Sequence, residues 1–124
     1  MIHVVVGLLF NAQGDILVAQ RDQHKFQGGR WEFPGGKLEE NESAFAALQR
    51  ELKEEIGIHV TEATSWQQFQ HTYPERTILL DVWRVTHFQG VPHGNEGQLI
   101  QWVSRDKLAT LDIPDANREI IGLF

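Results

Sequence analysis

Residues 36 to 58 read GKLEENESAFAALQRELKEEIGI, and this stretch decides much of the fold. Its apolar residues recur at the spacing of a helix that buries one stripe, at Ala44, Leu48, Leu52 and Ile56. Ser43 is a favourable N-cap, and Gly57 suits the left-handed position that closes a helix. The pattern therefore predicts a helix that begins after Ser43 and ends at about Ile56.

Three carboxylates share one face of this predicted helix. Glu51, Glu54 and Glu55 stand at positions i, i+3 and i+4, so they fall within an arc of about 100°. Like charges repel at this spacing, and carboxylate oxygens are the ligands that Mg²⁺ or Mn²⁺ prefers, so the cluster predicts a divalent-ion site. The carbonyl of Gly35 is a further candidate ligand, because glycine lets the backbone approach an ion closely.

The same stretch resembles the Nudix box: Gly, five residues, Glu, seven residues, Arg-Glu, an apolar residue, any residue, Glu-Glu, any residue, Gly and an apolar residue. The matching positions are Gly36, Glu42, Arg50, Glu51, Leu52, Glu54, Glu55, Gly57 and Ile58. Seven fixed identities at about one in fifteen each coincide by chance with a probability on the order of 10⁻⁸. A merely solvated acidic helix would not explain this spacing. Arg50 points away from the acidic arc and suits a structural partner such as Glu42 as well as a substrate contact.

Composition narrows the class of protein. The 124 residues predict a single domain, 1–124, and the net charge of −6 argues against binding to duplex nucleic acid. The absence of cysteine excludes disulfides and thiolate metal sites, and the six histidines show no zinc-ligand spacing. The apolar run from Ile2 to Phe10 is too short to span a bilayer, so we interpret it as a strand. We expect a cytoplasmic monomer that does not contact membranes.

Runs of β-branched and aromatic residues predict the strands. Val4 to Phe10 and Ile16 to Arg21 are joined by Asn-Ala-Gln-Gly-Asp, which predicts a hairpin. Trp31 to Phe33 is a short strand that ends at the Pro34-Gly35-Gly36 turn, after a polar loop at 22–30 that could lie over a site. The other predicted strands are Ile58 to Ala63, Ser65 to Tyr73, Thr77 to Phe88 and Leu99 to Val103.

The C-terminal part adds two short helical segments. A single turn is expected between Ser104 and Leu108, and a closing helix from Ala116 to Leu123, which Asp115 can cap. The order of elements predicts an α/β fold in which helices pack on the faces of a mixed β-sheet. The resemblance to the Nudix hydrolases implies an α/β/α sandwich.

The resemblance extends along the whole chain and is closest to the bacterial MutT group, which hydrolyses 8-oxo-dGTP to the monophosphate and pyrophosphate. It implies that Glu55 and Gly35 hold the principal ion, and that Glu51, Glu54 and Glu96 complete the metal and base set. It also implies phosphate contact by Arg21 and recognition of the purine edge by Asn117. The remaining implied substrate contacts are Glu32, Phe33, Pro34, Lys37, Tyr73 and Arg76.

Several of these residues have a simpler interpretation. Glu96 lies in a glycine-rich loop and could be solvated, and Asn117 could cap the last helix. Phe33 and Tyr73 suit a hydrophobic core as well as a base-binding wall. The loop also departs from the bacterial relatives, because Phe26 stands where they have a histidine.

The box predicts diphosphate chemistry but not the base. The leading interpretation is a Mg²⁺-dependent hydrolase of 8-oxo-dGTP, with Mn²⁺ as a substitute, that sanitises the nucleotide pool and acts as an antimutator. CTP or an oxidised dCTP is the alternative substrate, and Asn117 discriminates because an amide can both donate and accept on a purine edge. A non-catalytic nucleotide-binding module would not need the complete acidic set. ADP-ribose-type dinucleotides are a third option that the short chain weakens.

Overall fold

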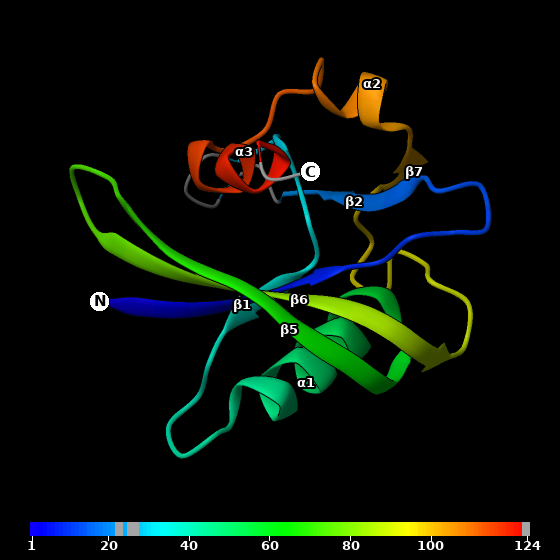
Figure 1. Cartoon of the computed structure of the whole chain (residues 1–124), viewed down its shortest axis with the longest axis horizontal. Coiled ribbons are helices and arrows are strands. Elements are labelled where there is room, and N and C mark those ends of the chain that lie inside the picture. Colours follow the sequence, from blue (N-terminus) through cyan, green and yellow to red (C-terminus); the bar gives the residue numbers. More distant parts are fainter. Residues whose placement is uncertain (22–23, 25–27, 123–124) are drawn as a thin grey trace.

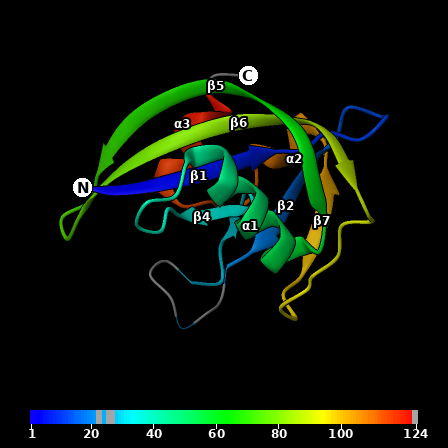
Figure 2. The same ribbon diagram turned by 90° about the horizontal axis from the view of Figure 1, so that it is seen from below.

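The computed structural model describes residues 1–21, 24 and 28–122. Two β-sheets and three helices are formed within these residues. Helix α1 (Ala44–Ile56) covers one face of the larger sheet, and α3 (Asp115–Ile121) lies on the opposite side (Figure 1). Seen from below, α1 lies across the sheet (Figure 2). Within this part of the chain, no helix has the length and apolar character needed to cross a bilayer.

The larger sheet has the strand order β4-β1-β6-β5. Strand β1 pairs in parallel with β6 and antiparallel with β4, and β5 pairs antiparallel with β6, so the predicted mixed sheet is confirmed. Alternate side chains of β1 reach opposite cores: Val5 packs with α1 and Val6 packs with α3. The four strands are β1 (Ile2–Leu8), β4 (Gly35–Lys37), β5 (His59–Thr72) and β6 (Thr77–Gln89).

Strand β5 corrects the prediction of two separate strands, at 58–63 and 65–73. It is continuous from His59 to Thr72, and its register against β6 shifts near Glu62 and between Ser65 and Gln67. Such bulges absorb an extra residue without ending a strand, so the polar residues in this segment interrupt the alternation rather than the strand.

The smaller sheet has the order β3-β2-β7 and is antiparallel. The predicted hairpin is correct only at its tip, where Phe10 bridges to Ile16 and the Leu17 N–H donates to the Leu9 carbonyl. Beyond it the flanking strands separate into different sheets, because β2 pairs with β3 and β7 instead of β1. The strands of this sheet are β2 (Ile16–Gln20), β3 (Trp31–Glu32) and β7 (Ile100–Val103).

The signals at the ends of α1 are confirmed. The Ser43 hydroxyl accepts from the Ala46 N–H, and Gly57 has the left-handed φ of 69°. Of the predicted stripe, Ala44 is only partly buried, and Ala47 joins the core in its place. The single turn after Ser104 is also present, as α2 (Arg105–Leu108).

Helix α3 starts one residue earlier than predicted. Pro114 occupies its N-cap position and no side chain caps it, so the prediction that Asp115 can cap the helix was wrong, and so was the alternative that Asn117 caps it. A proline needs no partner for a backbone N–H and fixes φ near the helical value, which favours it at a helix start. The predicted end of the helix at Leu123 lies outside the described residues.

Candidate active site

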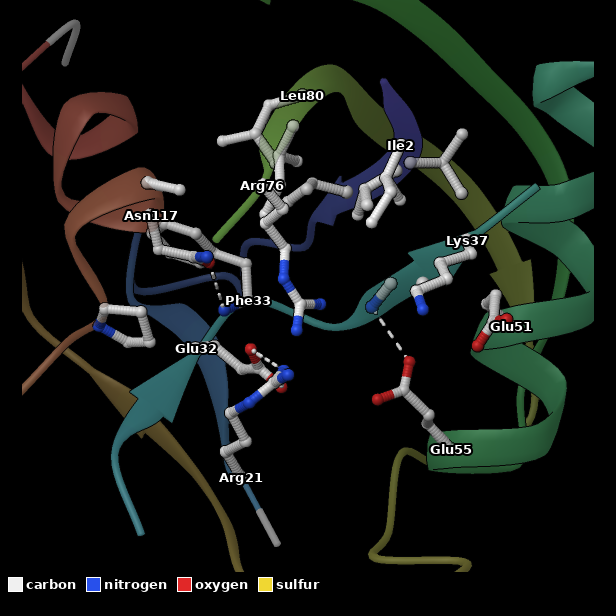
Figure 3. A pocket seen from close by; sticks show the side chains of 18 of the residues that line it. Ile2, Arg21, Glu32, Phe33, Lys37, Glu51, Glu55, Arg76, Leu80 and Asn117 are labelled. Atoms are coloured by element: carbon white, nitrogen blue, oxygen red, sulfur yellow. Dashed lines mark hydrogen bonds and ion pairs between the residues drawn. The ribbon is translucent and has the colours of Figure 1, made fainter. Parts of the chain in front are cut away.

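A cavity of about 630 Å³ separates α1 from α3. Figure 3 shows Glu51 and Glu55 projecting toward it from α1, Asn117 from α3, and Arg76 reaching into the space between. Twelve of the thirteen residues predicted for the site line this cavity. They are Arg21, Glu32, Phe33, Gly35, Lys37, Glu51, Glu54, Glu55, Tyr73, Arg76, Glu96 and Asn117.

Pro34 is the predicted residue that does not line the cavity. It is buried, and its carbonyl accepts from the Gly7 N–H at 2.8 Å. This bond fixes the chain between β3 and β4, so Pro34 shapes the wall through its backbone. The predicted loop at 22–30 lies largely outside the described residues, and so does Phe26.

The acidic wall is built by α1 against β4. One carboxylate oxygen of Glu55 accepts from the Gly35 N–H at 2.8 Å. Burial raises the pKa of Glu55 well above its usual range, and the neighbouring charges of Glu32, Glu51 and Glu96 raise it further, while the bond from Gly35 opposes them. Burial also raises the pKa of Glu51. These carboxylates are therefore held where their negative charge is poorly solvated.

Gly36 is required by this close approach. A Cβ atom at Gly36 would lie 2.3 Å from the Cδ of Glu51, a distance that real Cβ contacts do not show. Any larger residue would push the carboxylate out of its place beside β4. Gly36 lies in strand β4 and not in the predicted turn, so packing against Glu51 explains this glycine.

Arg50 does not point away from the acidic arc, which corrects the prediction from the helical wheel. Its guanidinium bonds to Glu42 at 2.8 Å as expected, but it also contacts Glu51 at 2.8 Å and Glu54 at 3.5 Å. The bond from Arg50 lowers the pKa of Glu42 to about 2. A long side chain folds back along the helix, so a wheel drawn through Cα positions misplaces its charged end.

The opposite wall is built around the Asn117 side chain. Its Oδ1 accepts from the Phe33 N–H at 3.1 Å, and Asn117 is only 9% exposed. The Tyr73 hydroxyl accepts from the Ala116 N–H at 2.9 Å. Phe33 and Tyr73 both belong to the buried core as well as to the cavity wall, so the two interpretations of these aromatics are compatible.

The sequence interpretation missed an apolar floor. Strands β1 and β6 run parallel here, with Ile2 paired to Ile78 and Val4 paired to Leu80. Those four residues and Val6 line the cavity between its two polar ends. The alternation of apolar residues along each strand could have indicated that these side chains share one face. Only the parallel pairing of β1 with β6 places the apolar residues of the two strands side by side.

The cations of the cavity are outnumbered by its carboxylates. Arg21, Lys37 and Arg76 line it, against the five glutamates named above. Arg21 is held by the Glu32 carboxylate, with contacts of 3.0 and 3.2 Å. A second recess of about 230 Å³ adjoins the acidic end, where Arg21, Glu32, Glu55 and Glu96 recur beside Gln20 and Gln98.

Comparison with known proteins identifies the architecture. The family model described as NUDIX domain matches residues 5–123. The chain belongs to the Nudix family. An 8-oxo-dGTP diphosphatase of Escherichia coli is 34% identical over 121 residues, which cover 98% of this chain and 94% of that relative. A CTP pyrophosphohydrolase of the same organism is 40% identical over 119 residues, which cover 92% and 87% of the two chains.

A solved structure supports the same conclusion. It comes from work on MutT of Aliivibrio salmonicida and Vibrio cholerae, and it aligns with a TM-score of 0.82 and 44% identity over 99% of this chain and 98% of that one. The Nudix fold predicted from the box is therefore confirmed. Members of this family are hydrolases that act on small nucleotides with a divalent metal, so the chain is an enzyme of this class.

The donor set of this Nudix site fits a divalent ion in its chemistry. Hard carboxylate oxygens line one end of the cavity, and the pKa of Glu55 is raised first by burial and then by the neighbouring charges of Glu32, Glu51 and Glu96. Among the described residues, no three acidic or histidine side chains are already grouped as a complete ligand set. Arg50 supplies positive charge beside Glu51 and Glu54, and each of its contacts uses one oxygen of the carboxylate.

Proposed function

We propose that this enzyme is a Mg²⁺-dependent nucleoside triphosphate pyrophosphohydrolase that converts 8-oxo-dGTP to 8-oxo-dGMP and pyrophosphate. Mn²⁺ substitutes for Mg²⁺, since both ions take carboxylate oxygen ligands. The names of the similar Escherichia coli diphosphatase and of the MutT structure support this substrate. Residues 1–124 act as one domain and as a monomer, and the role is removal of an oxidised precursor before it enters DNA.

The observation that carries the proposal is the fixed orientation of the Asn117 amide. The Phe33 N–H can only donate, so it selects the amide oxygen as its partner. The NH₂ group is then a donor for the substrate, and the second lone pair of the oxygen is an acceptor. Oxidation at C8 gives guanine an N7–H donor beside its O6 acceptor, which matches this pair. Unmodified guanine presents a lone pair at N7 to the amide oxygen.

The other residues of the cavity have complementary tasks. The floor of β1 and β6 takes the apolar faces of the base and sugar, with Phe33 and Tyr73 beside it. Arg21, Lys37 and Arg76 meet the phosphates. Because carboxylates outnumber these cations, a triphosphate can approach only if a further cation offsets the repulsion.

The ion is assigned to the carboxylates of Glu51, Glu54, Glu55 and Glu96 and to the Gly35 carbonyl. When bound, it neutralises phosphate charge and lowers the pKa of the attacking water. A carboxylate of Glu51, Glu54 or Glu96 accepts the proton that this water loses. The Gly35 N–H already occupies one oxygen of Glu55, so we assign this carboxylate to the ion and not to the role of base.

CTP or an oxidised dCTP is the second candidate substrate. The similarity to the CTP pyrophosphohydrolase favours it, at 40% identity over most of both chains. The amide orientation does not decide against it, because the exocyclic amine and N3 of cytosine also form a donor and acceptor pair that the Asn117 oxygen and NH₂ group can meet.

A panel of nucleotides tests the proposal. The purified full chain is assayed with Mg²⁺ and 8-oxo-dGTP, dGTP, CTP, oxidised dCTP and ADP-ribose, and the products are separated by ion-exchange chromatography. We expect the highest kcat/KM for 8-oxo-dGTP, with a monophosphate and pyrophosphate as products. Preference for a cytosine nucleotide would support the second candidate, and binding without turnover of any nucleotide would contradict an enzymatic role.

A further inference from the structure

The loop at 91–98 is bonded to the C-terminal end of the helix that carries the acidic cluster. A helix leaves its last four carbonyls without partners in the helix. In α1 the Lys53 carbonyl is taken by Gly57, and the next three are taken by this loop. Its donors are the His93 N–H to Ile56, the Asn95 N–H to Glu55, the Asn95 side chain to Glu54 and the Gln98 side chain to Glu55.

Gln98 makes the bond that matters most for the site. Its Nε2 donates to the Glu55 carbonyl at 2.8 Å, and its Oε1 accepts from the Glu96 N–H at 3.0 Å. One amide group therefore links the backbones of two residues whose carboxylates face the same cavity, although they lie far apart in the sequence. Glu96 itself is exposed in a turn, so its position depends on such external bonds.

The base of this loop is also fixed on its other side. The Leu99 carbonyl accepts from the Gln20 N–H at 2.9 Å, just before β7 pairs with β2. Gln98 thus lies between the C-terminal end of α1, to which its side chain is bonded, and the smaller sheet, which its neighbour Leu99 contacts. A side chain that lies between a helix end and a sheet can fix the distance between the helix end and the loop that leads to the sheet.

We propose that Gln98 is a positioning residue that holds Glu96 at a fixed spacing from Glu55, so that both carboxylates reach one divalent ion. Asn95 assists by anchoring the same loop to Glu54 and Glu55. The inference rests on the proposed metal role of Glu96. It extends that role to a neutral side chain that contacts neither ion nor substrate, of the kind whose loss typically weakens metal binding by 10- to 100-fold.

The test measures Mn²⁺ affinity of the nucleotide-free full chain by electron paramagnetic resonance. The variants are Gln98→Met, which keeps bulk but loses both bonds, Gln98→Ala, Glu96→Gln and the double variant of Gln98→Met with Glu96→Gln. Gln13→Ala is the matched control, since Gln13 is exposed in the turn between β1 and β2. Hydrogen exchange of the Glu96 amide reports the broken bond directly.

We expect Gln98→Met and Glu96→Gln each to weaken Mn²⁺ binding by about 10-fold or more. The double variant should bind no worse than Glu96→Gln alone, because both changes act through one carboxylate. Wild-type affinity in both Gln98 variants, or additive losses in the double variant, would overturn the positioning role. Unchanged Mn²⁺ binding by Glu96→Gln would overturn it together with the metal role of Glu96. A nucleotide panel without turnover would instead count against the proposed function alone.

Discussion

Substitutions of Asn117 distinguish whether its amide recognises the base or only stabilises the fold. Asn117→Ala removes both the acceptor for the Phe33 N–H and the groups that face the substrate. Asn117→Asp keeps an oxygen for Phe33 but replaces the NH₂ donor by a second acceptor, which would face the O6 of the base. The two variants therefore share one defect in recognition and differ in their effect on the fold.

The magnitudes follow from burial. Phe33 is 3% exposed, so its N–H loses a partner that water cannot easily replace, and Asn117→Ala should lower the free energy of unfolding by about 1–3 kcal/mol. A mispaired polar group in the complex has a similar cost, so the preference for 8-oxo-dGTP over dGTP should shrink by about 1–3 kcal/mol, or roughly 5- to 150-fold in kcat/KM. Asn117→Asp should lose the preference while remaining closer to wild-type stability.

The assay compares kcat/KM for both nucleotides at pH 8 and saturating Mg²⁺, beside urea unfolding of each variant. The loss should fall mainly on KM for 8-oxo-dGTP, with hydrolysis of dGTP much less affected. If Asn117→Ala depresses both substrates by the same factor, the amide is a structural link to Phe33 and the base is read elsewhere.

Three further predictions concern the acidic cluster and the reaction. Glu51→Gln and Glu55→Gln should each lower turnover by at least ~10²-fold in a folded protein, measured at saturating Mg²⁺; wild-type turnover of both would refute the assignment. Since the folded-state pKa of Glu55 is raised above 4.5, its contribution to stability is full below that pH and lost as the pH rises through the folded pKa. Metal-free wild type should therefore lose stability relative to Glu55→Gln between pH 5 and pH 8 in urea titrations, and a constant difference would contradict the buried charge. Hydrolysis in ¹⁸O-water should place the label in pyrophosphate, as expected for attack at the β-phosphorus, whereas label in the monophosphate alone would exclude that attack.

The helix and its carboxylates could be predicted because their signals are local. Ser43, the apolar stripe and Gly57 each act within a few residues, so α1 was placed to within a residue at both ends. The sheets were less accessible. Strand β1 pairs with β6 and β2 pairs with β7, and both partners lie far along the chain. The turn between β1 and β2 does not indicate which sheet each strand joins.

The residues predicted for the site, except Pro34, line one cavity, but several of the contacts between them were not predicted. The sequence motifs identified residues that lie around one cavity in the fold. The Arg50 contacts with Glu51 and Glu54 were not predicted, because they depend on the conformation of a flexible side chain. The hydrogen bond between Asn117 and Phe33 joins residues 84 positions apart, so no local sequence pattern predicts it. The Gln98 link to Glu55 is non-local in the same way.

At the end of α1, burial and neighbouring like charges oppose the ionised form of Glu55, and the negative end of the helix dipole acts in the same direction. The protein offsets them locally, since Arg50 contacts the cluster, the loop at 91–98 satisfies the helix carbonyls, and Leu48, Leu52 and Ile56 are fully buried. None of these devices removes the charge that faces the cavity. The divalent ion that we propose for this site would reduce the repulsion directly, so the features that oppose folding at this helix end are the same ones that favour metal binding under the proposal.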